Sequence, residues 1–265
     1  MKRWIPFVKT DPTVAVIRMQ GVIASGTRGT LSDQALAPVI EKAFARGKPA
    51  AVALQINSPG GSPVQSSLIG ARIRRLAAEK DVPVLAFVED VAASGGYWLA
   101  AAADEIYADP SSVVGSIGVI SASFGAHELI GRYGIERRVY TAGTSKSMND
   151  PFRPENPEDV ARIKELLEDI HGTFIDHVKD RRGAKLDTEA DLFNGQVWLA
   201  AKAQKLGLID GIGHLMPVLK ERFGDKVRLR RYGVRRSLFS RFGAQVAEDA
   251  LGAIEERAAF GRFGL

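Results

Sequence analysis

Short apolar runs alternate with longer amphipathic segments along the first half of the chain. The run at 51–56 is bounded by turn residues, which is the mark of a buried strand. Ser32 suits the N-cap of the helical pattern that follows it. The apolar runs predict strands at 14–20, 51–56, 82–88 and 105–108, and the amphipathic segments predict helices at 33–46, 63–80 and 94–103.

The second half of the chain continues this alternation. The pattern predicts strands at 113–121, 135–141 and 227–232, a helix near 124–133, a long amphipathic helix from Pro157 to about Arg182, and two shorter helices. Strands that alternate with helices predict an α/β fold with a mainly parallel sheet and flanking helices. We therefore divide the chain into an N-terminal segment (1–13), one domain (14–232) and a C-terminal tail (233–265).

Composition narrows the class of protein. The chain has 265 residues, of which 45% are hydrophobic, so it is typical of a globular protein rather than a disordered or fibrous one. It contains no cysteine, which excludes disulfides, thiolate metal sites and cysteine nucleophiles. The formal net charge is +5, but seven basic residues and no acidic residue lie between Lys226 and Phe242. The rest of the chain is nearly neutral, so we expect no nucleic acid partner.

The first candidate for chemistry is the glycine pair Gly60-Gly61 in the loop after the strand at 51–56. Adjacent glycines let the backbone approach a ligand closely and direct N–H groups toward it, as an oxyanion hole requires. A tight strand-to-helix turn without any function is the alternative. Phosphate binding is disfavoured because neither G-x-G-x-x-G nor a Walker motif is present.

A second loop, Ala92 to Tyr97, places Ser94 between a predicted strand and a predicted helix. Its spacing resembles the G-x-S-x-G nucleophile elbow, except that Ala92 replaces the first glycine. The alternative is that Ser94 serves only as a helix N-cap. Because loops that follow parallel strands converge at one edge of a sheet, we expect Ser94 to lie near Gly60 and Gly61.

A serine nucleophile needs a base, and none of the four histidines lies in a glycine-rich loop. Lys146 is the only lysine between Lys80 and Lys164, and it lies in a loop. A lysine base needs its pKa lowered from about 10.4 toward neutrality, and burial by apolar neighbours such as Met148 and Phe152 supplies such desolvation. An ordinary solvated lysine is the alternative.

Taken together, these motifs resemble the signal peptide peptidase A (SppA) family of serine peptidases, which has a Clp/crotonase-type fold. The resemblance runs from about Val14 to Tyr232. It rests on the segments 56–61, 93–97, 115–119 and 143–153. It implies that Ser94 is the nucleophile and Lys146 the general base, and that the N–H groups of Gly61 and Gly95 form the oxyanion hole while Gly60 shapes the turn.

The resemblance also implies partners. Short members of the family form homo-oligomers in which serine and lysine come from neighbouring subunits. We expect a peptide substrate that is short or unfolded and apolar, such as a signal-peptide remnant or a membrane-associated segment, and we expect no cofactor and no metal. Ser116, with Ser145 as second choice, is the candidate that orients the lysine. Tyr97 and Ile117 are candidates for the substrate groove, while core packing is expected for Trp98.

Two other functions fit parts of the sequence. A crotonase-like acyl-CoA enzyme would use the oxyanion hole alone, with Glu89 and Asp90 as the carboxylates near the loops. A non-catalytic scaffold at a membrane surface is the other. We expect no transmembrane helix, and a cytoplasmic or peripheral inner-membrane location, with the basic tail and the amphipathic pattern at 246–258 either solvated or docked on anionic lipid or a neighbouring subunit.

Overall fold

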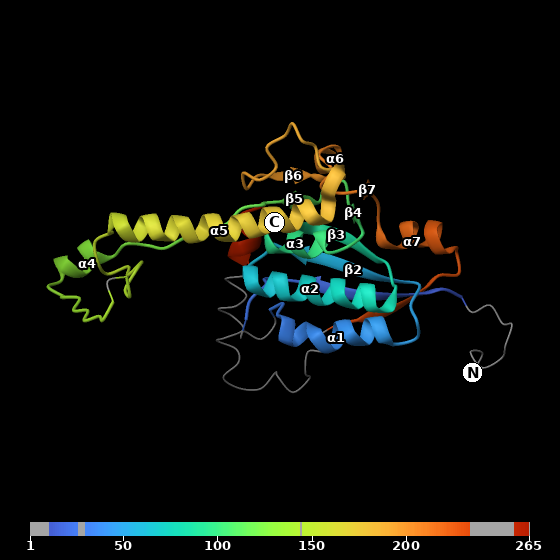
Figure 1. Cartoon of the computed structure of the whole chain (residues 1–265), viewed down its shortest axis with the longest axis horizontal. Helices are drawn as coiled ribbons and strands as arrows, with labels where there is room; N and C mark the ends of the chain where they lie inside the picture. The colour runs from blue at the N-terminus through green and yellow to red at the C-terminus, as the bar shows by residue number, and fades with distance from the viewer. Residues whose placement is uncertain (1–10, 26–29, 144, 234–256, 265) are drawn as a thin grey trace. The chain divides into compact units, whose positions relative to one another are not determined.

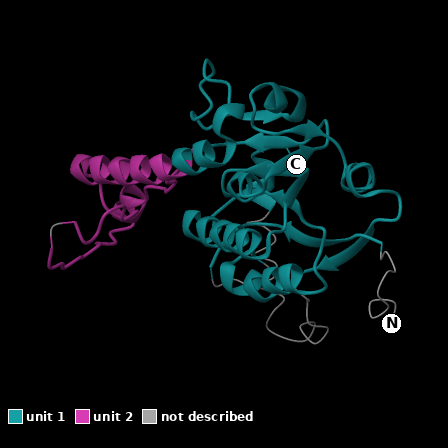
Figure 2. Ribbon diagram, turned by 45° about the vertical axis from the view of Figure 1, so that its right-hand side comes forward, with its two compact units in different colours: residues 1–117, 175–265 teal, residues 118–174 magenta. Residues whose placement is uncertain are grey.

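The computed structural model describes residues 11–25, 30–143, 145–233 and 257–264. The chain forms two compact units, unit 1 with residues 1–117 and 175–265 and unit 2 with residues 118–174 (Figure 2). Of the C-terminal tail (233–265) the structure describes residues 233 and 257–264, so the amphipathic pattern at 246–258 lies mainly outside the described residues. The division into segments 1–13, 14–232 and 233–265 stays a prediction.

Unit 1 is an α/β domain built on one sheet (Figure 1). The strand order is β6-β5-β3-β2-β1-β8, with β4 paired to both β3 and β7. Every pairing is parallel except that of β5 with β6. The predicted α/β fold with a mainly parallel sheet is therefore confirmed. Its strands are β1 (Thr13–Gln20), β2 (Ala51–Ser58), β3 (Val84–Ala93), β4 (Glu105–Ala108), β5 (Val113–Gly115), β6 (Val197–Leu199), β7 (Gly211–Ile212) and β8 (Arg228–Tyr232).

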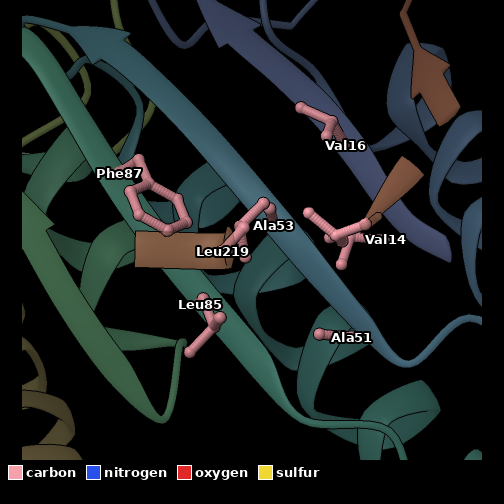
Figure 3. Close-up of a cluster of buried hydrophobic side chains, with 8 residues drawn as sticks. Val14, Val16, Ala51, Ala53, Leu85, Phe87 and Leu219 are labelled. Carbon is pink, nitrogen blue, oxygen red and sulfur yellow. The ribbon is translucent and has the colours of Figure 1, made fainter. Parts of the chain in front are cut away.

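Helices of unit 1 cover both faces of the sheet. Side chains of the central strands alternate between the faces, so Val14 and Val16 join the cluster under α7 that includes Leu219 (Figure 3). Ala15 and Ile17 are buried on the opposite face, where α1 packs. These helices are α1 (Asp33–Ala45), α2 (Pro63–Lys80), α3 (Gly95–Ala101), the 3-10 turn η2 (Gly183–Lys185), α6 (Ala200–Lys205) and α7 (Leu215–Phe223).

The predicted helix starts are confirmed for α1 and α2. The Ser32 hydroxyl accepts a hydrogen bond from the Ala35 N–H at 3.3 Å, and the Ser62 hydroxyl accepts one from Gln65 at 3.4 Å. Each serine therefore satisfies an N–H group that has no acceptor within its helix.

Unit 2 contains α4 (His127–Arg132) and most of α5 (Pro157–Arg182), whose last residues belong to unit 1. Two predicted strands differ from the structure, one shortened and one absent from the described residues. The strand expected at 113–121 ends at Gly115, because Gly115 (φ 110°) and Ser116 (φ 52°) leave the extended conformation. The segment 135–141 is irregular and pairs with no strand among the described residues. No helix in the described part of the chain has the length and apolar character needed to cross a membrane.

Candidate active site

Ser94 occupies the sharp turn between β3 and α3. Its backbone has φ 52° and ψ −124°, a conformation that non-glycine residues adopt rarely and at a cost of order 1–3 kcal/mol. The Ser94 N–H donates to the Gly115 carbonyl at 2.8 Å, and the Ser94 carbonyl accepts from the Trp98 N–H at 3.0 Å. Ser94 is the N-cap residue of α3 by position, but its side chain makes no capping hydrogen bond, so the alternative that the side chain serves as a cap is wrong. A strained strand-to-helix turn of this kind presents a serine hydroxyl at the edge of a sheet.

The loop after β2 is held against the segment that follows β1. The Ile23 N–H donates to the Gly60 carbonyl at 2.8 Å, and the Ser62 N–H donates to the Ile23 carbonyl at 2.7 Å. Both bonds belong to a parallel bridge between Ile23 and Gly61, so the N–H of Gly61 itself points away from Ile23. Within the described residues this N–H has no acceptor, and neither has that of Gly95 at the start of α3.

The two glycine-rich loops lie against one another. A Cβ on Gly60 would lie 2.8 Å from the Ala93 carbonyl oxygen, the Gly95 nitrogen and the Ser94 Cβ. A Cβ on Gly95 would lie 3.4 Å from the Gly61 nitrogen. The structure therefore brings Gly60, Gly61, Ser94 and Gly95 together, with the main-chain nitrogens of Gly61 and Gly95 beside the Ser94 turn. A serine and oxyanion donors are two of the parts that acyl transfer requires, and a general base is the third.

Ser116 lies beside the same turn. β3 and β5 pair Ala93 with Gly115, and Ser116 follows directly, its N–H donating to the Gln196 carbonyl at 2.7 Å. The residue is partly buried and adopts a positive φ of 52°. Ile117, the next residue, has a fully buried side chain, so it exposes no surface to a substrate groove, contrary to the prediction.

Tyr97 is not a groove residue, contrary to the prediction. Its side chain has no exposed surface, and its hydroxyl donates to the Leu208 carbonyl at 2.7 Å. Desolvation raises the pKa of this hydroxyl. Trp98 is also buried and stacks on His177 with ring centroids 4.3 Å apart, so its expected core role is confirmed. All seven residues of α3 are buried, because this helix has no polar face.

Lys146 lies in unit 2, and its side chain is exposed. Its N–H donates to the Gly143 carbonyl at 3.3 Å. Met148 is only partly buried and Phe152 is 38% exposed, so these neighbours do not bury the ammonium group as predicted. Ser145, beside it, is partly buried.

Asp150 anchors the loop that carries Lys146. Its carboxylate accepts hydrogen bonds from the Phe152 N–H at 3.0 Å and from Arg137 Nε at 3.2 Å. These interactions, with the Phe152 N–H first, hold the pKa of Asp150 below its usual value. The Pro151 carbonyl accepts from the Ala126 N–H at 2.6 Å, which fixes the loop to the start of α4.

The carboxylates near the loops already have partners. Glu89 accepts from Gln55 Nε2 at 2.6 Å and pairs with Arg18 at 3.6 Å, while Asp90 accepts from Asn57 Nδ2 at 2.5 Å. The described residues contain no group of three side chains suited to a metal ion.

The sequence did not single out Ser58, a fully buried serine that hydrogen bonds to the Gly60 loop. Its position within the first motif was the only signal for it.

The chain matches one protein family and is similar to several known proteins. The model of a family described as Peptidase family S49 matches residues 77–225. The whole chain is 49% identical over 286 aligned residues to part of the Na(+)/H(+) antiporter NhaA of Brucella melitensis, of which it covers 39%. It is also 32% identical over 210 residues to the chloroplastic serine protease SPPA of Arabidopsis thaliana, with 76% of this chain and 31% of that protein aligned. The chain thus spans well under half the length of these two relatives.

A solved structure has the same fold. The membrane-bound stomatin-specific protease 1510-N superposes with a TM-score of 0.52 and 17% identity, over 86% of this chain and 100% of that one. At this identity the likeness concerns the fold alone.

Proposed function

Because this chain belongs to peptidase family S49, a serine protease family with the Clp/crotonase-type fold, we propose that it is an endopeptidase with a Ser94–Lys146 dyad. The observation that carries the proposal is the strained turn at Ser94, beside which the N–H groups of Gly61 and Gly95 have no acceptor among the described residues. A serine that served only to start a helix would cap it with its side chain, and Ser94 does not.

The reaction follows from the chemistry of these groups. Lys146 takes the proton of the Ser94 hydroxyl, and the Ser94 oxygen attacks the peptide carbonyl to give a tetrahedral intermediate. The Gly61 and Gly95 N–H groups stabilise its oxyanion, each contributing about 10²–10³ in kcat. Lys146 then protonates the leaving amine, and water hydrolyses the acyl-enzyme. Ser116, next to the carbonyl that accepts from Ser94, orients the lysine, with Ser145 as the second candidate.

We further propose that the dyad is completed between subunits of a homo-oligomer. Ser94 belongs to unit 1 and Lys146 to unit 2, and Lys146 is exposed in the single chain. A neutral lysine base needs an apolar surrounding, which a neighbouring subunit would supply. Unit 2 exposes nine large apolar side chains, and exposed apolar surface of this kind is typical of a protein interface. They are Ile120, Phe124, Leu129, Tyr133, Ile135, Tyr140, Phe152, Leu166 and Ile170.

Two single variants and their mixture test the dyad and the sharing together. Ser94→Ala and Lys146→Ala should each abolish cleavage of a fluorogenic peptide while the oligomer mass stays that of the wild type. If the site is shared, co-assembly of the two inactive variants places intact Ser94 beside intact Lys146 in about a quarter of the sites of a ring. Recovery of activity on mixing is the expected result. Turnover in either single variant contradicts the dyad, and a mixture that stays inactive after proven subunit exchange contradicts a shared site.

We propose a membrane-proximal role with apolar peptides as substrates. One protein of similar fold is described as a membrane-bound protease, and seven basic residues with no acidic residue lie between Lys226 and Phe242 of this chain. Cleaved signal-peptide remnants or membrane-associated segments would be apolar substrates of this kind. Co-sedimentation with anionic liposomes, with and without residues 232–265, tests the peripheral contact. Equal binding of both forms contradicts a role for the tail.

A further inference from the structure

Ser58 ends β2 and contacts the residue after β1, the Gly60 loop and the first turn of α3. Its side chain has no exposed surface. The hydroxyl donates to the Gly21 carbonyl at 2.7 Å and accepts from the Gly60 N–H at 3.2 Å. A hydroxyl has one proton to donate, and here that proton is committed to Gly21, which leaves the oxygen to receive the Gly60 N–H.

These bonds restrain a segment that glycine alone would leave free. Gly60 has φ 100° and Gly61 has φ 141°, a region open to glycine, and glycine is the residue with the most backbone freedom. The Ile23 N–H holds the Gly60 carbonyl, which sets the plane of the peptide that carries the Gly61 N–H. Ser58 holds the N–H on the other side of Gly60. Both peptide planes around Gly60 are therefore fixed, and with them the direction of the Gly61 N–H.

The main chain of Ser58 reaches the other half of the site. A Cβ on Gly96 would collide with the Ser58 carbonyl oxygen, so the first turn of α3 packs directly on this residue. Ser58 thus contacts the loop of Gly61 through its hydroxyl and the helix of Gly95 through its carbonyl.

We propose that Ser58 is a positioning residue that sets the distance and direction of the two oxyanion-hole N–H groups, a role that rests on the function proposed above. The hydroxyl touches neither substrate nor the reacting atoms, and it acts through Gly60. Preorganised donors lower the barrier because they need no reorientation when the oxyanion forms. Loss of the hydroxyl should therefore weaken binding of the transition state and leave binding of the substrate unchanged.

The test compares Ser58→Ala with Ser112→Ala. Ser112 is a matched control, since it is also buried in unit 1 and its hydroxyl donates to the main-chain carbonyl of Glu89, with the Val88 carbonyl as a longer neighbour at 3.3 Å. In Ser58→Ala, kcat for a fluorogenic peptide should fall about 10- to 100-fold with KM unchanged. Affinity for a peptide aldehyde, whose adduct with Ser94 carries the oxyanion, should fall by the same factor. Ser112→Ala should keep the wild-type kcat and aldehyde affinity.

A kcat in Ser58→Ala equal to that of the wild type overturns the proposal, as does an equal loss in both variants. If Ser58→Ala does not fold, Ser58→Cys carries the test, because a thiol has the same shape as the hydroxyl group and is only a weak donor. A wild-type protein that neither cleaves peptides nor binds the aldehyde refutes the proposed peptidase itself. A wild type that is active while the Ser58 variants lose nothing refutes only the role of Ser58.

Discussion

Gly95 is glycine because of space, and this makes its replacement by alanine a sharp test of the site's packing. A Cβ at this position would overlap Ser66 Oγ, while its next neighbours are Ile23 Cδ1 at 3.2 Å and the Gly61 nitrogen at 3.4 Å. Ser66 is fully buried, and its hydroxyl is held on the Ser62 carbonyl at 2.9 Å, so it has little room to move. Gly95→Ala should therefore push α3 away from α2.

The expected cost is that of overpacking a core, about 1–3 kcal/mol. For a domain of this size each kcal/mol lowers the thermal midpoint by roughly 2–4 °C. Ser66→Ala alone should cost about 0.5–1.5 kcal/mol, the value of one hydrogen bond. In the double variant the overlapping oxygen is gone, so most of the cost of Gly95→Ala should disappear. Activity should stay reduced, since the new methyl group still lies near the Gly61 N–H.

The assay is thermal unfolding of the wild type, Gly95→Ala, Ser66→Ala and the double variant at one protein concentration, with kcat measured on each. Gly172→Ala is the control, because a Cβ there meets nothing within 4 Å and helical alanine should stabilise by up to about 1 kcal/mol. Additive losses in the double variant would show that Gly95 and Ser66 do not compete for space, and the packing argument would be refuted.

Three further outcomes are expected in the same unfolding assay. Arg182→Met should cost about 3–5 kcal/mol, because this buried guanidinium binds the Gly207 carbonyl at 3.0 and 2.8 Å and Asp210 at 2.7 Å. Lys185 is a half-exposed partner of Asp210, so Lys185→Met should cost less than about 1 kcal/mol. Equal losses in the two variants would contradict this ranking. Tyr97→Phe should cost about 1–2 kcal/mol and leave KM and kcat unchanged, whereas a changed KM would return Tyr97 to the groove. Burial lowers the pKa of His177 below its ordinary 6.5. As the pH falls below 6.5, the unfolded chain therefore binds a proton that the folded chain does not, and the free energy of unfolding decreases. His177→Gln should reduce this loss of stability between pH 7.5 and 5, and an unchanged slope would contradict the argument.

Much of the fold was predictable because the parallel strands are buried on both faces and so appear as continuous apolar runs. β3 is one exception, since the predicted strand stops at Val88 while the observed one continues to Ala93. The pairing with β2 moves from Ile56–Val88 to Ser58–Ala92, so three residues of β3, Glu89 to Val91, lie opposite Asn57 alone and form a bulge. The strand continues through this bulge because it pairs with its neighbours in the sheet, whereas the charged residues Glu89 and Asp90 favour a strand end when the sequence is considered alone.

The site shows the same division between local and tertiary information. Glycine pairs and a serine at strand ends predict loops that meet, because parallel topology brings strand ends to one edge. The segment 135–141 was predicted as a strand but has no strand beside it in the described structure, and a strand needs a neighbour to satisfy its backbone. The surroundings of Lys146 were beyond prediction for a related reason, since the proposed neighbour is another subunit.

The identity of the nucleophile is tested most directly by labelling with a fluorophosphonate, followed by mass spectrometry of the modified peptide. The account predicts one adduct, on Ser94, in the wild-type oligomer, and a labelling rate reduced by about 10²-fold or more in Lys146→Ala, because general base catalysis typically contributes 10²–10⁴. An adduct on any other residue, or labelling of Lys146→Ala at the wild-type rate, would contradict it.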